Sequence, residues 1–231
     1  ASAGGVSLVS VENSALFNSA NSENLTYTEQ AGSSTTQQYF SVWLNPTNSS
    51  RQQEIFHCDD GTDTNREWFE FSATGQLTFT SKKTSDQCNL VTTALYRDIG
   101  WIHVELLIDT PNATAADRNI LKVNGVRVTD FVTETSFTQN DTFGTLCNVG
   151  DTFRIGAYRL AGYYFDGYMA EFIRLDGDPT GISTGEFDTT GLYWTPKSST
   201  DIQALTFGTN GFYLDNTTNA QTDASGEGNN F

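Results

Sequence analysis

The amino-acid sequence predicts one large all-β domain, and three observations support that fold class. The 231 residues are enough for a single domain with a substantial core. Aromatic residues make up 13% of the chain and methionine occurs once, a composition typical of strands rather than helices. The 20 glycines suit the many tight turns that join antiparallel strands.

Apolar residues at alternate positions predict the strands in the first half of the chain. Residues 39–44 form the first clear strand, and residues 54–58 form a second, short one. Residues 68–79 predict a hairpin that turns at Thr74-Gly75, and residues 82–89 predict a polar connection. The side chains expected to share a face are Phe40, Val42 and Leu44 in the first strand, and Phe69 and Phe71 opposite Leu77 and Phe79 in the hairpin.

The second half begins with the most regular alternation, at residues 101–109. Asn124-Gly125 then predicts a two-residue turn inside a hairpin at 120–128, because such a turn needs positive φ at both positions. Residues 130–148 predict a long loop or irregular strands. Short strands are expected at 153–157 and 212–214, and the inward side chains of the 101–109 strand are Ile102, Val104, Leu106 and Ile108.

One long strand at residues 163–177, entered through a kink at Asp166-Gly167, is expected to lie in the middle of a sheet, because it is apolar on both faces. Glu171 interrupts one face. It is either a catalytic acid or a structural carboxylate that ties down a neighbouring loop. The two predicted faces are Tyr168, Ala170 and Phe172 against Met169, Ile173 and Leu175.

The chain divides into three predicted segments. Residues 1–37 are an N-terminal arm or edge strand, built around Val6, Leu8 and Val11. Residues 38–177 form the β-sandwich. Residues 178–231 are rich in turn residues, and we expect them to pack on the sandwich as an extension that leads into a linker.

The charge of the chain argues against nucleic acid as a partner. Its net charge is −16, with no basic stripe to meet phosphates. No apolar run approaches the roughly 20 residues that span a bilayer, so membrane insertion is not predicted. The three cysteines, Cys58, Cys88 and Cys147, have no metal-type spacing and are interpreted mainly as free thiols, with a Cys58–Cys88 bridge as an alternative.

Two clusters invite a chemical interpretation. Asp59, Asp60, Asp63 and Asn65 form the densest group of oxygen ligands, which predicts a calcium or sugar contact or, alternatively, a solvated loop with Asx turns. The spacing of that loop does not match an EF-hand. His103 and Glu105 share a strand face, which suits acid–base chemistry or a packed structural pair. The sequence contains no recognisable catalytic pair of carboxylates.

Three segments resemble the concanavalin A-like lectin/glucanase superfamily in its laminin-G-like form: residues 100–104 followed by 107–109, residues 122–128 and residues 165–176. The C-terminal part, from Phe187 through Trp194-Thr195-Pro196-Lys197 to Asp223-Ala224-Ser225-Gly226, resembles a signature of tailed-bacteriophage virion proteins. The resemblance covers roughly residues 38–230. It implies a jelly-roll β-sandwich of two antiparallel sheets with a turn-rich C-terminal extension.

The resemblance implies a non-enzymatic virion protein, from a tail, a fibre or a head decoration, that recognises host-surface glycan. Tyr163, Tyr164, Tyr193 and Trp194 are then the candidate sugar-stacking residues, unless they pack beneath the loops. The implied location is the surface of the virion, and the implied partners are other virion subunits, with a trimer as the expected oligomer. Three alternatives remain: a purely structural decoration protein, a secreted cellular lectin, and a glycan hydrolase, which needs two facing carboxylates in a cleft.

Overall fold

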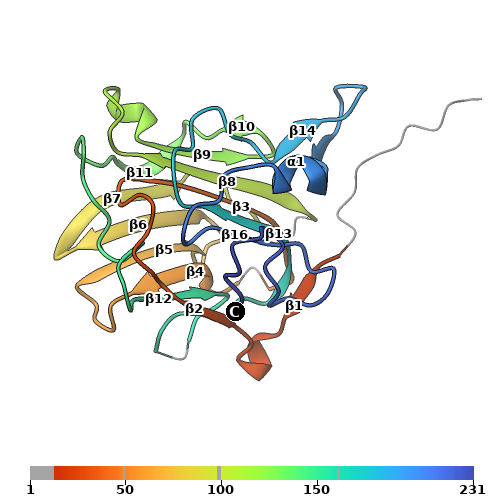
Figure 1. Cartoon of the computed structure of the whole chain (residues 1–231), viewed down its shortest axis with the longest axis horizontal. Coiled ribbons are helices and arrows are strands. Elements are labelled where there is room, and N and C mark those ends of the chain that lie inside the picture. The colour runs from red at the N-terminus through yellow and green to blue at the C-terminus, as the bar shows by residue number, and fades with distance from the viewer. Residues whose placement is uncertain (1–12, 49, 98–99, 161) are drawn as a thin grey trace, which may run out of the picture.

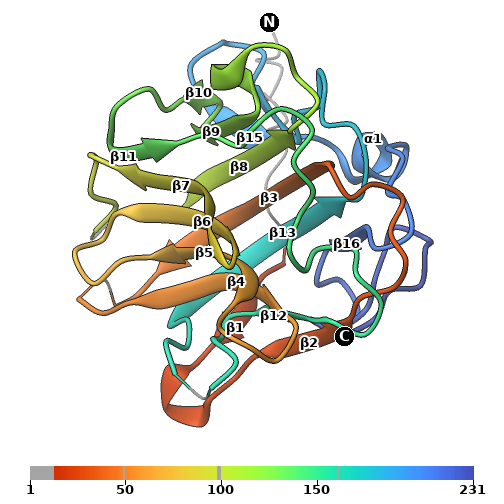
Figure 2. The ribbon, with the colours of Figure 1, turned by 90° about the vertical axis from the view of Figure 1, so that its left-hand side faces the viewer.

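The computed structural model describes residues 13–48, 50–97, 100–160 and 162–231. Its two seven-stranded antiparallel sheets confirm the predicted all-β sandwich. Figures 1 and 2 show the two layers, which we call sheet A and sheet B. The predicted strand around Val6, Leu8 and Val11 lies outside the described residues.

Sheet A has the strand order β1-β13-β3-β8-β9-β10, and β16 also pairs with β13. The strands of sheet A are β1 (Ala15–Phe17), β3 (Gln37–Pro46), β8 (Ile102–Asp109), β9 (Asn119–Val123), β10 (Val126–Arg127), β13 (Gly167–Leu175) and β16 (Phe212–Leu214). Sheet B has the order β11-β7-β6-β5-β4-β12-β2. Its strands are β2 (Leu25–Thr28), β4 (Gln53–Asp59), β5 (Asn65–Phe71), β6 (Leu77–Lys83), β7 (Ser85–Thr92), β11 (Phe131–Thr135) and β12 (Thr152–Ile155).

A small hairpin and three single helical turns complete the described structure. The hairpin pairs β14 (Gly185–Phe187) with β15 (Trp194–Pro196). The helical turns are η1 (Ser19–Asn21), η2 (Ala115–Asp117) and α1 (Ser199–Gln203). None of the described helices is long and apolar enough to cross a membrane.

The main core lies between the two sheets and is rich in phenylalanine. Phe40 of β3 stacks on Phe56 of β4 with ring centroids 4.5 Å apart, so the layers meet through aromatic faces. All the inward side chains predicted for the strands at residues 39–44 and 101–109 belong to this core, which confirms the alternation in both strands. They are Phe40, Val42, Leu44, Ile102, Val104, Leu106 and Ile108.

Both predicted hairpins have the expected register. Phe69 pairs with Phe79 and Phe71 with Leu77 across the 68–79 hairpin. Val123 pairs with Val126 around the second turn, where Asn124 has φ 49° and Gly125 has φ 74°. Positive φ at both central positions is what an Asn-Gly turn supplies at low cost, so the local sequence determines this hairpin.

The outer face of sheet A is covered by the chain that follows β13, as Figure 1 shows for α1 and β14. A second apolar cluster fills the contact, with Tyr39, Leu107, Ile173 and Leu175 from the sheet and Ile202, Phe207 and Tyr213 from the covering chain. This packing explains why sheet A strands are apolar on both faces. The boundaries at 37/38 and 177/178 stay predictions.

Two sequence predictions were wrong. Phe172 does not share a face with Tyr168: Phe172 and Met169 both lie in the main core, while Tyr168 is 38% exposed. The cause is a β-bulge at Glu171, where φ is 51° and the pairing with β3 shifts register. An extra residue at a bulge moves every later side chain of the strand to the opposite face. Odd and even positions in the sequence do not show that such a bulge is present.

The second error concerns residues 82–89, which are not a polar connection. β6 continues to Lys83, and β7 begins at Ser85 after a turn residue, Thr84, with φ 65°. The outer face of sheet B is solvent-facing here, so polar side chains do not exclude a strand. All three cysteines are buried free thiols, which confirms the free-thiol interpretation.

Candidate functional site

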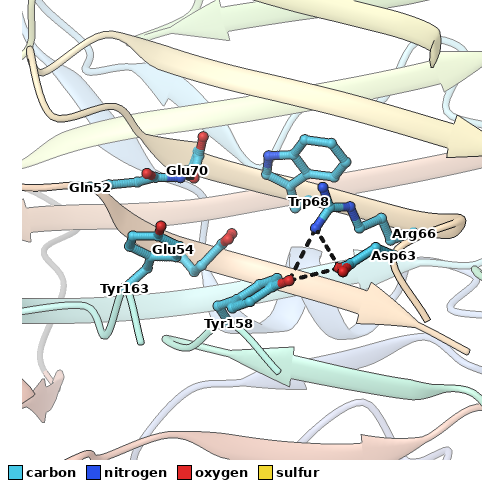
Figure 3. Close-up of a pocket in the computed structure, with 8 residues that line it drawn as sticks. All are labelled: Gln52, Glu54, Asp63, Arg66, Trp68, Glu70, Tyr158 and Tyr163. Atoms are coloured by element: carbon cyan, nitrogen blue, oxygen red, sulfur yellow. Dashed lines mark hydrogen bonds and ion pairs between the residues drawn. The ribbon is translucent and has the colours of Figure 1, made fainter. Parts of the chain in front are cut away.

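The outer face of sheet B carries a pocket of about 440 Å³ (Figure 3). Strands β4 and β5 form its floor, because alternate side chains of a strand point to the same face. The loop between β12 and β13 and the loop between β4 and β5 form its walls. The lining residues are Gln52, Glu54, Asp63, Arg66, Trp68, Glu70, Tyr158 and Tyr163.

A β-bulge in β4 sets the composition of the floor. The pairing between β4 and β5 shifts register between Glu54 and Phe56, so Ile55 and Phe56 are both fully buried in the core. As a result Glu54 and His57 both face outward. Glu54 is then the direct cross-strand partner of Glu70, and His57 the partner of Trp68.

Three aromatic rings and one arginine line the pocket. The Arg66 guanidinium lies 4.4 Å from the centroid of the Trp68 ring, a cation–π contact. Figure 3 shows Trp68 between Arg66 on one side and Glu70 on the other. Tyr158 packs against Tyr163 with centroids 5.7 Å apart, and its hydroxyl donates to Asp63 over 2.8 Å.

The facing carboxyls of Glu54 and Glu70 are nearly inaccessible to solvent, with 2% and 7% exposure. Directly opposed side chains have Cβ atoms about 5 Å apart. Burial raises the pKa of Glu70 to about 7, although the Gln52 amide donates to its Oε2. Burial and then the adjacent Glu70 raise the pKa of Glu54 well above its usual 4.5. Near neutral pH Glu70 is therefore about half ionised, and the pair as a whole retains at least one proton.

His57 follows Glu54 along β4, opposite Trp68, and its ring is neutral. Burial, followed by the charges of Arg66, Arg154 and Arg159, lowers its pKa to about 3. Its Nδ1 is 3.6 Å from Glu54, and its Nε2 is 3.7 Å from Asp59. A neutral imidazole cannot neutralise the carboxyls, so the floor of the pocket keeps its acidic character.

We expect a Glu70→Gln variant to lose a pH-dependent part of the protein's stability. Glu70 has a higher pKa folded than unfolded, so its stabilisation is complete below about pH 4.5 and is lost as pH rises through 7. Between pH 4.5 and 8 the unfolding free energy of the unmodified chain should therefore fall by about 2–3 kcal/mol more than that of the variant. Urea unfolding at several pH values measures this, with exposed Glu134→Gln as the control. Parallel curves for the two variants would contradict the assignment.

The four predicted calcium ligands do not converge. Asp59 is buried and pairs with Arg154, whereas exposed Asp63 pairs with Arg66 at 3.2 Å and Arg159 at 2.9 Å. Asp60 accepts from the Thr62 amide and the Asn65 side chain, as in an Asx turn. No group of three or more acidic, His or Cys side chains in the described ranges is arranged to hold a metal. Calcium binding here stays a prediction.

The four predicted sugar-stacking aromatics lie on two sides of the sandwich. Tyr163 lines the pocket on sheet B, with half-buried Tyr164 beside it, whose carbonyl oxygen accepts from Arg51. Tyr193 and Trp194 lie instead on the β14–β15 hairpin outside sheet A. Tyr193 is 62% exposed, but the Trp194 indole turns inward and donates to His103 Nδ1 over 3.0 Å. Their role in sugar binding stays a prediction.

The contacts of His103 and Glu105 fit the structural interpretation. Burial lowers the pKa of His103 to about 4, so its ring is neutral. Because Nδ1 accepts from Trp194, the proton sits on Nε2, which lies 3.2 Å from the Thr184 hydroxyl. Glu105 accepts from Tyr39 over 2.7 Å. The covering chain thus buries this face.

Glu171 also has a structural contact. It is half-buried and accepts a hydrogen bond from the Tyr213 hydroxyl of β16. The bulged residue therefore ties β13 to the covering chain, as the structural interpretation of this carboxylate expected.

Sequence reasoning missed most of the pocket. The alternation of Arg66, Trp68 and Glu70 along β5 was a usable signal, since it sets a polar and aromatic face opposite Phe69 and Phe71. The facing pair of Glu54 and Glu70 left no such signal. Its partners are 16 positions apart and are brought together only by the bulged pairing of β4 with β5.

The family model described as the concanavalin A-like lectin/glucanases superfamily, Laminin_G_3, matches residues 18–175 of this chain. No protein with a curated description matches the sequence.

Solved structures are similar in fold at low identity. Domains LG4-5 of the mouse laminin alpha1 chain are 13% identical, with TM-score 0.51, over 76% of this chain and 47% of that chain. Domain 4 of AbnA, a GH43 extracellular arabinanase from Geobacillus stearothermophilus, in complex with arabinotriose, is 15% identical, with TM-score 0.50, over 74% of this chain and 80% of that chain. Tailspike protein 2 of the Escherichia coli O157:H7 bacteriophage CAB120 is 16% identical, with TM-score 0.47, over 73% of this chain and 24% of that chain.

Proposed function

We propose that this chain, which belongs to the concanavalin A-like lectin/glucanases superfamily, is a non-enzymatic glycan-binding module. The observation that carries the proposal is the pocket on sheet B. Trp68 and Tyr163 offer flat ring surfaces beside Gln52, Glu54 and Glu70, whose polar groups suit sugar hydroxyls. The fold can carry an oligosaccharide site, since the arabinanase domain is described in complex with arabinotriose.

Hydrolysis is the alternative that the facing carboxyls raise. Glycosidases need one protonated and one ionised carboxyl at the scissile bond. Burial raises the pKa of Glu70 to about 7 and that of Glu54 well above its usual value, so near neutral pH a protonated Glu54 lies beside a partly ionised Glu70. Binding is still the proposed role because both carboxyls are nearly inaccessible, with 2% and 7% exposure. Release of reducing ends from an oligosaccharide that the pocket binds would contradict a purely binding role.

The biological setting that we propose is the surface of a bacteriophage virion, with host glycan as the ligand. The support is the resemblance of the C-terminal segments around Phe187, Trp194 and Asp223 to tailed-phage virion proteins. The net charge of −16 fits an exposed surface that does not contact nucleic acid.

A glycan array of the purified chain, probed with calcium and again with EDTA, tests the proposed function. We expect binding in both conditions, because the carboxylates of the 59–65 loop are already paired with arginines and turn donors. Loss of binding in EDTA would instead place a required calcium ion at that loop. A folded sample that binds no glycan in either condition would overturn the proposal.

A second candidate function is attachment to other subunits through the β14–β15 hairpin. Phe187, Leu192 and Tyr193 are 56%, 74% and 62% exposed, and an apolar tip of this kind is typical of a protein contact. We expect the chain to sediment as an oligomer, a trimer in our proposal, and a Leu192→Ser/Tyr193→Ser variant as a monomer. Exposed Val132→Ser on β11 is the control. A monomeric unmodified chain at about 100 µM would count against self-association.

A further inference from the structure

The two ends of the pocket differ in how their charges are matched. At one end Asp63 contacts two arginines, Arg66 at 3.2 Å and Arg159 at 2.9 Å, so its charge is neutralised. At the other end Glu54 and Glu70 face each other beside Gln52, as Figure 3 shows. Arg66 is the only cationic side chain among the lining residues, and it is held over the Trp68 ring.

The acidic end has unused hydrogen-bonding capacity. Glu54 is 2% exposed, and its buried Oε2 has no hydrogen-bond partner within the described part of the chain. A buried carboxyl oxygen left unpaired costs about 1–3 kcal/mol or more, so such a group in a pocket wall points to an absent ligand. The Gln52 amide donates a hydrogen bond to Glu70 and not to Glu54. No ion pair in the described ranges joins either glutamate to an arginine or lysine.

We propose, on the basis of the glycan-binding function above, that the sugar unit held in this pocket carries a protonated amine, which lies between Glu54 and Glu70. The ligand class is therefore an oligosaccharide that contains a free amino sugar. An ammonium group brings three donors, enough to pair with the unpaired Glu54 oxygen and with Glu70 together. The nitrogen edge of the Trp68 indole points toward Glu70 in Figure 3, so a sugar ring stacked on Trp68 would place a substituent near both carboxyls.

Other sugar substituents fit this end less well. A sugar carboxylate or sulfate would meet two carboxyls and a chain of net charge −16, so anionic glycans are disfavoured. An N-acetyl group offers one N–H donor in place of three and carries no charge, and it brings a methyl group against buried carboxyls, so it matches them less well than an ammonium group does. A neutral hydroxyl can bond one carboxyl but brings no positive charge that would favour ionisation of the pair.

The proposal has a consequence for pH dependence. The groups that face the pair are His57 from β4, Arg66 from β5, Asp63 from the β4–β5 loop, and Tyr158 and Tyr163 from the β12–β13 loop. Among these only Arg66 is positively charged near neutral pH, because burial lowers the pKa of His57 to about 3. The free pair retains protons, since burial raises the pKa of Glu70 to about 7. An ammonium group favours the ionised pair, so binding releases protons and strengthens as pH rises from 5 to 7.

Titration calorimetry with two matched oligosaccharides tests this inference. The unmodified chain is titrated with a glucosamine tetramer and with an N-acetylglucosamine tetramer at pH 5 and pH 7. At pH 7 we expect the glucosamine tetramer to bind at least about tenfold more tightly than the acetylated one, as a charge-assisted bond requires. Its affinity should fall at least about threefold at pH 5. Ethanolamine, as a free amine, should bind more weakly than the tetramer.

Two glutamine variants locate the effect. Glu54→Gln/Glu70→Gln keeps side-chain size but removes both charges, and it should abolish the preference for the free amine. Glu186→Gln, at an exposed position on the distant β14–β15 hairpin, should leave that preference unchanged. If the double variant does not fold, the pH dependence of the unmodified chain still decides the matter.

Each other outcome overturns the inference. Equal or tighter binding of the acetylated tetramer would overturn the amine assignment and leave the glycan-binding function standing. Tighter glucosamine binding that weakens as pH rises to 7 would show that the carboxyls act as neutral donors, against the proposal. Failure of the glucosamine tetramer to bind would also overturn it, and a positive glycan array with a different sugar would still support the wider function.

Discussion

A Trp68→Ala variant is expected to bind oligosaccharide about 10–100-fold more weakly than the unmodified chain. Trp68 is the largest ring in the pocket, it is half-buried, and Arg66 holds it in place from one side. Truncation of an aromatic anchor of this kind typically costs about 1.5–3 kcal/mol of binding free energy. The gap left between Arg66 and Glu70 would also admit water to the carboxyl pair.

Affinity for the best glycan of the array, measured by calorimetry, tests this expectation. The matched control is Trp101→Ala: Trp101 is 39% exposed and contacts Tyr168, on the other sheet. It should leave affinity within about twofold. Equal losses in the two variants, or no loss in either, would show that the sugar binds away from this pocket.

Replacement of Arg174 by methionine is expected to lower the unfolding free energy by about 3–5 kcal/mol. Arg174 is fully buried, donates to both carboxylate oxygens of Glu29, and donates to the Gln38 side chain over 2.9 Å. Its guanidinium also lies 5.0 Å from the Phe153 ring. Methionine fills much of the volume but leaves Glu29 as an uncompensated buried charge.

Chemical denaturation of the variant measures the loss. Arg127→Met removes a surface ion pair with Asp117, in which both side chains are about 40% exposed, and it should cost less than about 1 kcal/mol. Addition of Glu29→Gln to the Arg174 variant should restore part of the stability, because the orphaned charge is then gone. A loss for Arg174→Met no larger than that for Arg127→Met would contradict a stabilising role for the buried pair.

Local signals in the sequence were sufficient for most of the sandwich. Alternation placed Phe40 and Val104 in the core, and Asn124-Gly125 fixed a hairpin through a backbone conformation that few other residues adopt cheaply. These predictions succeeded because strand alternation and turn chemistry act over a few residues. Where a bulge interrupts a strand, as at Glu171, the same reasoning reversed the faces beyond it.

The candidate site depended on contacts between distant residues. Tyr163 was identified from its loop position, but its partners across the pocket were not, because β4, β5 and the β12–β13 loop meet only in the folded sheet. Trp194 was equally prominent in the sequence, yet its indole is committed to His103 beneath the hairpin. A loop-borne aromatic residue has the same sequence pattern in both situations.

The sequence by itself determined the all-β class, the hairpin registers and the apolar faces of strands without a bulge, since each follows from residue chemistry repeated at short spacing. The tertiary structure decided which faces are covered and which are open. It buried the His103 and Glu105 face of sheet A beneath the C-terminal chain, and through a bulge it turned Glu54 to meet Glu70 on sheet B. The physical reason is that burial and the pairing of two carboxyls depend on long-range packing, which sets their pKa values and their chemistry.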